Sequence, residues 1–172
     1  MQARACGPDL MRQVLFLDID GVLHRGNSYM TRDGVTSSAP GRIELFEFVP
    51  VVDRLLEPYP TVEVVLSSDW AYRFGVDYVR DRLPSQLLRD RIREATYKGC
   101  DFDEQFWPML TRGAQVVDYV RRHSLVRWLA IDDRRDGFDG HWQRLVHCQS
   151  ESGLGDTVVV ELLRRRLRQE FS

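Results

Sequence analysis

The sequence predicts an α/β protein in which a parallel β-sheet is sandwiched between helices in three layers. Short apolar segments, each long enough for one strand, alternate with segments of helical periodicity. These segments lack polar alternation, as is typical of strands buried on both faces of a parallel sheet. Each segment is followed by carboxylate or hydroxyl side chains, at the edge where such sheets bind ligands. The strand segments are 14–17, 61–66 and 125–131.

The first strand runs directly into a pair of acids, Asp18 and Asp20. Residues two apart in an extended chain point to the same side, so the two carboxylates repel unless a cation or a proton lies between them. A hard divalent ion such as Mg2+ takes oxygen ligands and would satisfy both acids. Gly21 allows a sharp backbone turn directly after the second acid.

Residues 24–41 form a loop that is rich in glycine, serine, threonine and asparagine. The loop is long for a connection inside a compact domain, and such loops are usually functional or disordered. We expect a flap beside the acid pair, with a short hairpin around Asp33 and Gly34. Residues 42–57 then show near-helical spacing, and Pro50 suits the first turn of a second helical piece.

The second strand, 61–66, leads into Ser67, Ser68 and Asp69. Two helices are expected after it, over 71–83 and 85–95, and residues 96–110 have no regular pattern. The stretch 74–110 therefore reads as a small helical insertion. It is too short to cover the sheet edge fully, so the site is expected to be open or thinly covered.

The segment 111–123 is an amphipathic helix with Thr111 as its N-cap. The third strand ends in a second acid pair, Asp132 and Asp133, and residues 143–147 suit a short fourth strand. The last helix is expected to begin at Gly155 or Asp156. The residues expected to face inward from these helices are Ala114, Val117, Tyr119 and Val120, and then Val158, Val159, Leu162, Leu163 and Leu167.

Size and composition indicate one domain of 172 residues without a global basic field, since the net charge is −2. Residues 1–12 read as a flexible tail, and Met11 is a candidate start. The 3 cysteines include no C-x-x-C pair and no signal peptide precedes them, which favours a reducing, cytoplasmic location. No apolar run approaches the ~20 residues of a membrane span. Cys100, Cys148, Trp70 and Trp142 are interpreted as packing residues.

Taken in order, the motifs LFLDIDGVL, VVLSSDW, the arginine of LTRGAQVVDYV, and WLAIDD resemble the four motifs of the haloacid dehalogenase-like (HAD-like) superfamily of phosphohydrolases. A closer similarity is to the HAD domain of Swiss Army Knife RNA-repair proteins. It extends over LFLDIDGVLH, the S-S-x-W stretch, LPSQLLRDRI and the closing Gly153-Leu154. The chain departs from that family at Asp69-Trp70-Ala71, where an arginine is commonly found.

The resemblance implies a Rossmann-like HAD fold with a minimal cap or none. It also implies that Asp18 is the nucleophile that forms an aspartyl-phosphate, and that Asp20 is the general acid and base. Mg2+ would be held by the Asp18 carboxylate, the Asp20 backbone carbonyl and Asp133. Asp132 would either reach the ion through water or support the other ligands, and the sequence leaves this choice open.

The remaining positions carry alternatives. Ser67 would hydrogen-bond a phosphoryl oxygen, with Ser68 as its rival. Arg112 would stabilise charge on the transferring phosphoryl group, with Lys98, the only lysine, as the competitor. His24 would touch the substrate or only line the flap. Asp136 would support the metal or serve as a turn acid.

The expected function is a Mg2+-dependent phosphatase, with a nucleotide or a nucleic-acid end as the substrate suggested by family analogy. Two alternatives remain: a phosphatase for small metabolites, and a catalytically silent binding module on the same fold. The presence of both Asp18 and Asp20 argues against the silent module. The sequence does not indicate the oligomeric state.

Overall fold

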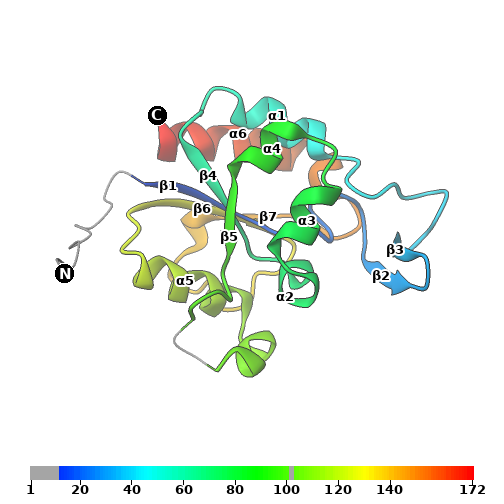
Figure 1. Cartoon of the computed structure of the whole chain (residues 1–172). Helices are drawn as coiled ribbons and strands as arrows, with labels where there is room; N and C mark the ends of the chain where they lie inside the picture. Colours follow the sequence, from blue (N-terminus) through cyan, green and yellow to red (C-terminus); the bar gives the residue numbers. More distant parts are fainter. Residues whose placement is uncertain (1–11, 101–102) are drawn as a thin grey trace.

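The computed structural model describes residues 12–100 and 103–172. At its centre lies a five-stranded sheet in the order β5-β4-β1-β6-β7, in which all neighbouring strands are parallel (Figure 1). This confirms the predicted α/β class with a parallel sheet. The strands are β1 (Gln13–Leu17), β4 (Val62–Leu66), β5 (Ile92–Ala95), β6 (Arg127–Asp132) and β7 (Leu145–His147).

The central strand β1 fixes where the site forms. It pairs with β4 on one side and with β6 on the other, over its whole length. Leu17 is aligned with Leu66 of β4 and with Ile131 of β6. Because the three strands run in the same direction, the residues that follow them emerge at one edge of the sheet.

Alternate residues of β1 face two separate cores. Leu15 and Leu17 pack in a cluster with α1 (Val49–Leu56) and α6 (Thr157–Phe171), whereas Val14 and Phe16 pack against α5 (Arg112–Arg122). Figure 1 shows α1 and α6 on one side of the sheet and α5 on the other. This is the three-layer arrangement expected for strands that are apolar on both faces.

The loop after β1 carries the predicted hairpin. Strands β2 (Ser28–Thr31) and β3 (Gly34–Ser37) pair antiparallel, and Arg32 and Asp33 form the turn. The hairpin extends away from the main sheet on the side where α2 lies (Figure 1).

Two helix predictions differ from the structure. In the segment 42–57 only the second piece is helical: α1 has Pro50 in its first turn as expected, whereas residues 42–48 are irregular. The segment 71–83 contains two helices, α2 (Asp69–Phe74) and α3 (Val76–Arg82), divided at Gly75. The φ of 87° at Gly75 is a backbone conformation that ends a helix and that glycine adopts without strain.

The prediction of one helix over 85–95 was wrong in its second part. Helix α4 (Gln86–Arg91) is followed directly by β5, which pairs with β4 at the sheet edge. Pairing with β4 overrides the helical pattern, since Ile92 and Ala95 are buried while Arg93 remains exposed. The stretch 74–110 thus contributes a strand to the main sheet, besides helices and the 3-10 turn η1 (Glu104–Met109).

The caps of the last two helices are as predicted, but their buried faces differ in part. Thr111 accepts a hydrogen bond from the Ala114 backbone, and Asp156 caps α6. Ala114, Val117 and Val120 are only half-buried, because α5 turns Arg112, Gln115, Val116, Asp118 and Tyr119 toward the interior. In α6, Val158 is 75% exposed, contrary to expectation, while Leu163 and Leu167 are buried.

Several remaining predictions concern the edges of the molecule. Most of the predicted tail, including Met11, lies outside the described residues, but Arg12 forms an ion pair with Glu63 at 2.6 Å. Trp142 is 51% exposed and was wrongly expected in the core, whereas Trp70 is buried. In residues 12–100 and 103–172, no helix combines the length and the apolar character needed to cross a membrane.

Candidate active site

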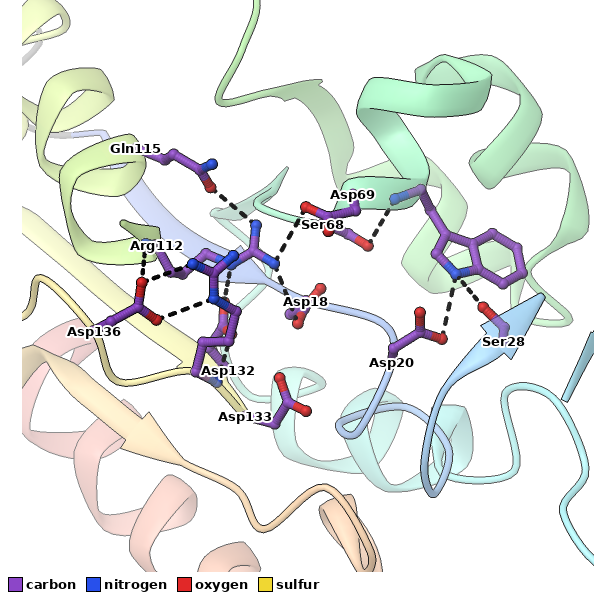
Figure 2. Close-up of polar contacts among 12 residues, drawn as sticks. Asp18, Asp20, Ser28, Ser68, Asp69, Arg112, Gln115, Asp132, Asp133 and Asp136 are labelled. Atoms are coloured by element: carbon purple, nitrogen blue, oxygen red, sulfur yellow. Dashed lines mark hydrogen bonds and ion pairs between the residues drawn. The ribbon is translucent and has the colours of Figure 1, made fainter. Parts of the chain in front are cut away.

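Three carboxylates converge at the carboxyl edge of the sheet. Asp18 follows β1, Asp132 is the last residue of β6, and Asp133 follows it. One oxygen from each lies within 4.8 Å of the others (Figure 2). Asp18 and Asp132 are buried and Asp133 is half-buried, so their charges have little water to screen them.

Burial first, and repulsion between neighbouring acids second, raise the pKa values of these carboxyl groups. Burial raises the pKa of Asp18, and burial together with the Asp18 charge raises the pKa of Asp132 well above its usual range. The same two causes raise the pKa of Asp133 from 3.8 to about 6. The cluster therefore attracts positive charge strongly, and a cation bound among the three oxygens would relieve the repulsion.

The turn after Asp20 is shaped around Asp133. Gly21 has a φ of 68°, and a Cβ at this position would lie 2.3 Å from the Asp133 Oδ2 atom. Only glycine therefore allows the turn and the Asp133 carboxylate to approach so closely. An all-oxygen cradle of this kind fits a hard divalent cation such as Mg2+.

Arg112 is the cation of the site. Its Nε lies 3.0 Å from Asp132, and its Nη2 lies 3.6 Å from both Asp18 and Asp69 (Figure 2). Burial lowers the pKa of Arg112, but the charges of Asp132 and Asp18 outweigh this and raise the pKa above its ordinary value. Arg112 is thus a fixed positive charge beside Asp18.

The start of α5 positions this arginine. Gly113 packs so closely on the loop after β6 that a Cβ there would lie 2.0 Å from the Gly137 backbone. The Asp136 carboxylate accepts a hydrogen bond of 3.2 Å from the Arg112 backbone and is also paired with Arg134 at 2.7 Å. Asp136 therefore anchors the helix start rather than joining the three-acid cluster.

The two serines after β4 have different surroundings. The Ser67 hydroxyl is fully buried and has no hydrogen-bond partner among the described residues. The Ser68 hydroxyl accepts a hydrogen bond from the Trp70 backbone and caps α2. An unpaired buried hydroxyl is costly unless a ligand satisfies it, so the position of Ser67 favours contact with a bound group.

Asp20 lies beside the cluster and is less buried, with 27% of its side chain exposed. It borders a cavity of about 230 Å³ that lies between the hairpin and α2. Ser28, Tyr29, Met30 and Val35 line it from the hairpin, and Asp69, Trp70, Arg73 and Phe74 line it from α2. A group held there would be within reach of Asp20.

Two other residues that were predicted to contact substrate, Lys98 and His24, do not contact the three-acid cluster as Arg112 does. Lys98 is on an exposed turn, with its ammonium 4.9 Å from the Tyr97 ring centroid. His24 is completely buried and contacts the Asp20 carboxylate at 2.9 Å. Neither position supports the expected contact with substrate.

Three further residues lie near Arg112 and Asp20, and the sequence pattern did not identify them as parts of the site. Asp69 pairs with Arg112, and Gln115 accepts a 3.0 Å hydrogen bond from the same guanidinium. Trp70 was interpreted as core, yet its indole nitrogen lies 3.3 Å from Asp20. The S-S-x-W resemblance was the one signal that pointed toward Trp70.

The parallel sheet flanked by helices, with acids at the ends of β1 and β6, is consistent with a haloacid dehalogenase-like domain. Comparison with protein families makes the assignment specific. The family model described as the HAD domain in Swiss Army Knife RNA repair proteins matches residues 14–159, and the chain belongs to this family. Neither the curated proteins nor the solved structures compared with the chain gave a match.

Proposed function

We propose that this chain is a Mg2+-dependent phosphatase that hydrolyses phosphomonoesters through an aspartyl-phosphate on Asp18. The observation that carries the proposal is the convergence of Asp18 with Asp132 and Asp133 within 4.8 Å. The buried guanidinium of Arg112 lies next to Asp18. A carboxylate can attack an anionic phosphate only where positive charge offsets the repulsion, and Arg112 supplies one such charge at this edge of the sheet.

In the first step, an Asp18 oxygen forms a bond to phosphorus while the bond from phosphorus to the ester oxygen breaks. The departing oxygen takes a proton from the Asp20 carboxyl group and leaves as an alcohol. Arg112 and the Ser67 hydroxyl hold the phosphoryl oxygens during the transfer. The products of this step are a phosphorylated Asp18 and an ionised Asp20.

In the second step, Asp20 takes a proton from a water molecule as the water oxygen bonds to phosphorus. The bond between phosphorus and Asp18 then breaks, which restores the Asp18 carboxylate and releases inorganic phosphate. Asp20 ends the cycle protonated, as it began, so one group serves as acid and then as base.

Mg2+ would be held by the side chains of Asp18 and Asp133 and by the Asp20 backbone carbonyl, and when bound it supplies charge neutralisation at the phosphate. Asp132 is suited to a supporting role. Its Oδ2 lies 3.0 Å from Arg112, and its Oδ1 accepts a 2.9 Å hydrogen bond from the Arg134 backbone. Asp132 thereby keeps Arg112 beside the nucleophile.

The preferred substrate is a nucleotide or a nucleic-acid end. Two observations support this choice: the family is described as a domain of RNA repair proteins, and the cavity beside Asp20 is bordered by the exposed Tyr29. The group that leaves would occupy this cavity, with the hairpin as a flap. Exposed aromatic side chains can stack on bases without selecting a sequence.

A direct test measures hydrolysis of para-nitrophenyl phosphate with Mg2+ by wild type, Asp18→Asn and Asp139→Asn. Asp139 is exposed, so its substitution changes the net charge equally without touching the site. We expect Asp18→Asn to lose at least about 10^3-fold in kcat, as removal of a covalent nucleophile does, while Asp139→Asn remains active. Equal rates for wild type and Asp18→Asn would refute the proposal.

The substrate class needs a separate screen of 3′- and 5′-phosphorylated oligoribonucleotides, nucleoside monophosphates and sugar phosphates. A kcat/KM that is highest for the phosphorylated oligonucleotides or nucleotides would support the preferred class. A preference for sugar phosphates would instead support the small-metabolite phosphatase. A protein that binds these ligands but hydrolyses none would be the silent binding module.

A further inference from the structure

One oxygen of Asp20 is held by two donors from different parts of the fold. The His24 Nε2 atom lies 2.9 Å from Asp20 Oδ1, and the Trp70 Nε1 atom lies 3.3 Å from the same oxygen. Figure 2 shows Asp20 turned toward the indole, away from Asp18 and Arg112. Within residues 12–100 and 103–172, no donor contacts the other oxygen, Oδ2.

The surroundings of His24 determine which of its nitrogens carries the hydrogen. The Phe46 backbone N–H donates to His24 Nδ1 at 3.4 Å, so Nδ1 accepts and Nε2 carries the hydrogen that points at Asp20. His24 is completely buried and packs edge-on against the rings of Phe46 and Trp70. The φ of 65° at Phe46 is a strained conformation for an aromatic residue, and the surrounding packing maintains it.

Trp70 connects Asp20 to the hairpin. The indole is buried in the first turn of α2, and its single N–H also points at the Ser28 hydroxyl oxygen of β2, at 2.7 Å. The same N–H therefore serves two acceptors, one on the hairpin and one on Asp20 (Figure 2).

We propose that His24 and Trp70 are positioning residues for acid catalysis by Asp20, an inference that rests on the proposed function. Because both donors occupy Oδ1, a proton carried by Asp20 sits on Oδ2, the oxygen that remains free to donate to a departing group. As that proton moves to the ester oxygen, negative charge develops on the Asp20 carboxylate. The two N–H groups are already aimed at this charge and stabilise it without rearrangement.

The inference predicts a dependence on the leaving group. An alkyl phosphate releases a strongly basic oxygen and needs the proton of Asp20, whereas para-nitrophenolate leaves without one. The parameter kcat/KM covers steps up to the first irreversible one, which is the transfer to Asp18. Loss of a donor should therefore lower kcat/KM for an alkyl phosphate selectively.

Four variants separate the contacts. Trp70→Phe keeps an aromatic ring and removes both N–H contacts, while Ser28→Ala removes only the contact with the hairpin. His24→Leu removes the second donor, and His24→Gln replaces it with an amide N–H. The substrates are para-nitrophenyl phosphate and glycerol phosphate, each with Mg2+.

For Trp70→Phe and His24→Leu we expect kcat/KM for glycerol phosphate to fall about tenfold, and that for para-nitrophenyl phosphate by less than about twofold. Because Ser28 also lines the cavity for the leaving group, Ser28→Ala is expected to change both values together and so to keep their ratio. His24→Gln should recover at least part of the loss. If the two residues had a purely structural role, their substitution would lower kcat/KM for both substrates by the same factor.

Failure of this inference is distinguishable from failure of the proposed function. Suppose that Asp18→Asn is inactive but that Trp70→Phe lowers kcat/KM equally for both substrates. The proposed phosphatase activity is then supported, and the positioning role is overturned. If Ser28→Ala reproduces the Trp70→Phe ratio, the hairpin contact rather than the Asp20 contact is responsible, and the inference is again overturned. Should His24→Leu fail to fold, the comparison of Trp70→Phe with Ser28→Ala still decides the matter.

Discussion

Gly21 connects the backbone turn after Asp20 with the position of Asp133. Its φ of 68° would strain any other residue, and the space that a Cβ needs is taken by the Asp133 carboxylate, 2.3 Å away. Gly140 has a similar φ of 80° but open space around it. The two glycines therefore share the conformational requirement and differ only in the contact with an acid.

We predict that Gly21→Ala weakens Mg2+ binding by about tenfold or more, because a displaced Asp133 no longer faces Asp18. Both substitutions should lower folding stability, because alanine is strained in the left-handed backbone conformation of either glycine. In Gly140→Ala, however, the Mg2+ affinity should remain that of wild type. Titration calorimetry with Mg2+ measures both affinities. An unchanged affinity in Gly21→Ala would mean that Asp133 does not hold the ion.

At the scale of elements, the start of α5 carries the only cation that contacts the carboxylate cluster in the described part of the chain. Thr111 caps this helix, and Gly113 lets its first turn pack on the loop after β6. A glycine inside a helix is ordinarily a weak point, because alanine would stabilise the helix by about 0.5–1 kcal/mol. Here a Cβ would overlap the Gly137 backbone, so the close packing requires glycine at this position despite its low helix propensity.

Gly113→Ala should therefore destabilise the protein by about 1–3 kcal/mol, opposite in sign to the effect expected from helix propensity alone. Because the helix start must shift, kcat should fall as Arg112 moves away from Asp18. Urea denaturation measures the free energy of unfolding, and turnover of para-nitrophenyl phosphate measures the second effect. A stabilised Gly113→Ala variant with full activity would contradict this account of α5.

The sequence was sufficient to predict the elements that local pattern determines. The apolar strands β1, β4 and β6, the caps at Thr111 and Asp156, and the hairpin turn all follow from residue type and spacing. Strand β5 was missed because its residues, IREA, have no strand pattern of their own. Its conformation comes from hydrogen bonds to β4, which are 26 or more residues away in the chain.

The same distinction holds for the site. Asp18, Asp20, Asp132 and Asp133 were recognisable because they directly follow apolar strands. The contact of His24 with Asp20 and the two-sided contact of Trp70 depend on side-chain directions that spacing does not define. The packing of Gly113 on Gly137 joins the first turn of α5 to the loop after β6, two segments that no local pattern connects.

At the scale of the whole molecule, the order of the strands in the sheet brings the clustered acids together. Placing β1 between β4 and β6 brings residues 18, 67, 132 and 133 to one edge, although they are widely separated in the chain. Burial of this edge raises the pKa of Asp133 to about 6. Without a cation, ionisation of such an acid removes stability as the pH rises from about 3.8 to about 6.

Mg2+ should therefore stabilise the folded chain more at pH 7.5 than at pH 5, where protons compete for the carboxylates. At a concentration tenfold above its Kd, the ion should add about 1.4 kcal/mol, or roughly 3–6 °C in Tm, at pH 7.5. Thermal unfolding followed by circular dichroism measures the shift. Asp133→Asn should show little or none of it, and Asp139→Asn the full shift; equal shifts in the two variants would argue against the site.

The account depends most on Asp18 becoming phosphorylated. Under the proposed mechanism, Asp20→Asn should slow the release of phosphate from Asp18 but still permit transfer from para-nitrophenyl phosphate, so the phosphorylated form should accumulate. Acid quenching followed by borohydride reduction converts an aspartyl-phosphate to homoserine, which peptide mass spectrometry locates in the sequence. We expect homoserine at position 18 and its absence when Asp18→Asn is added. Homoserine at another acid, or turnover without any phosphorylated residue, would contradict the mechanism.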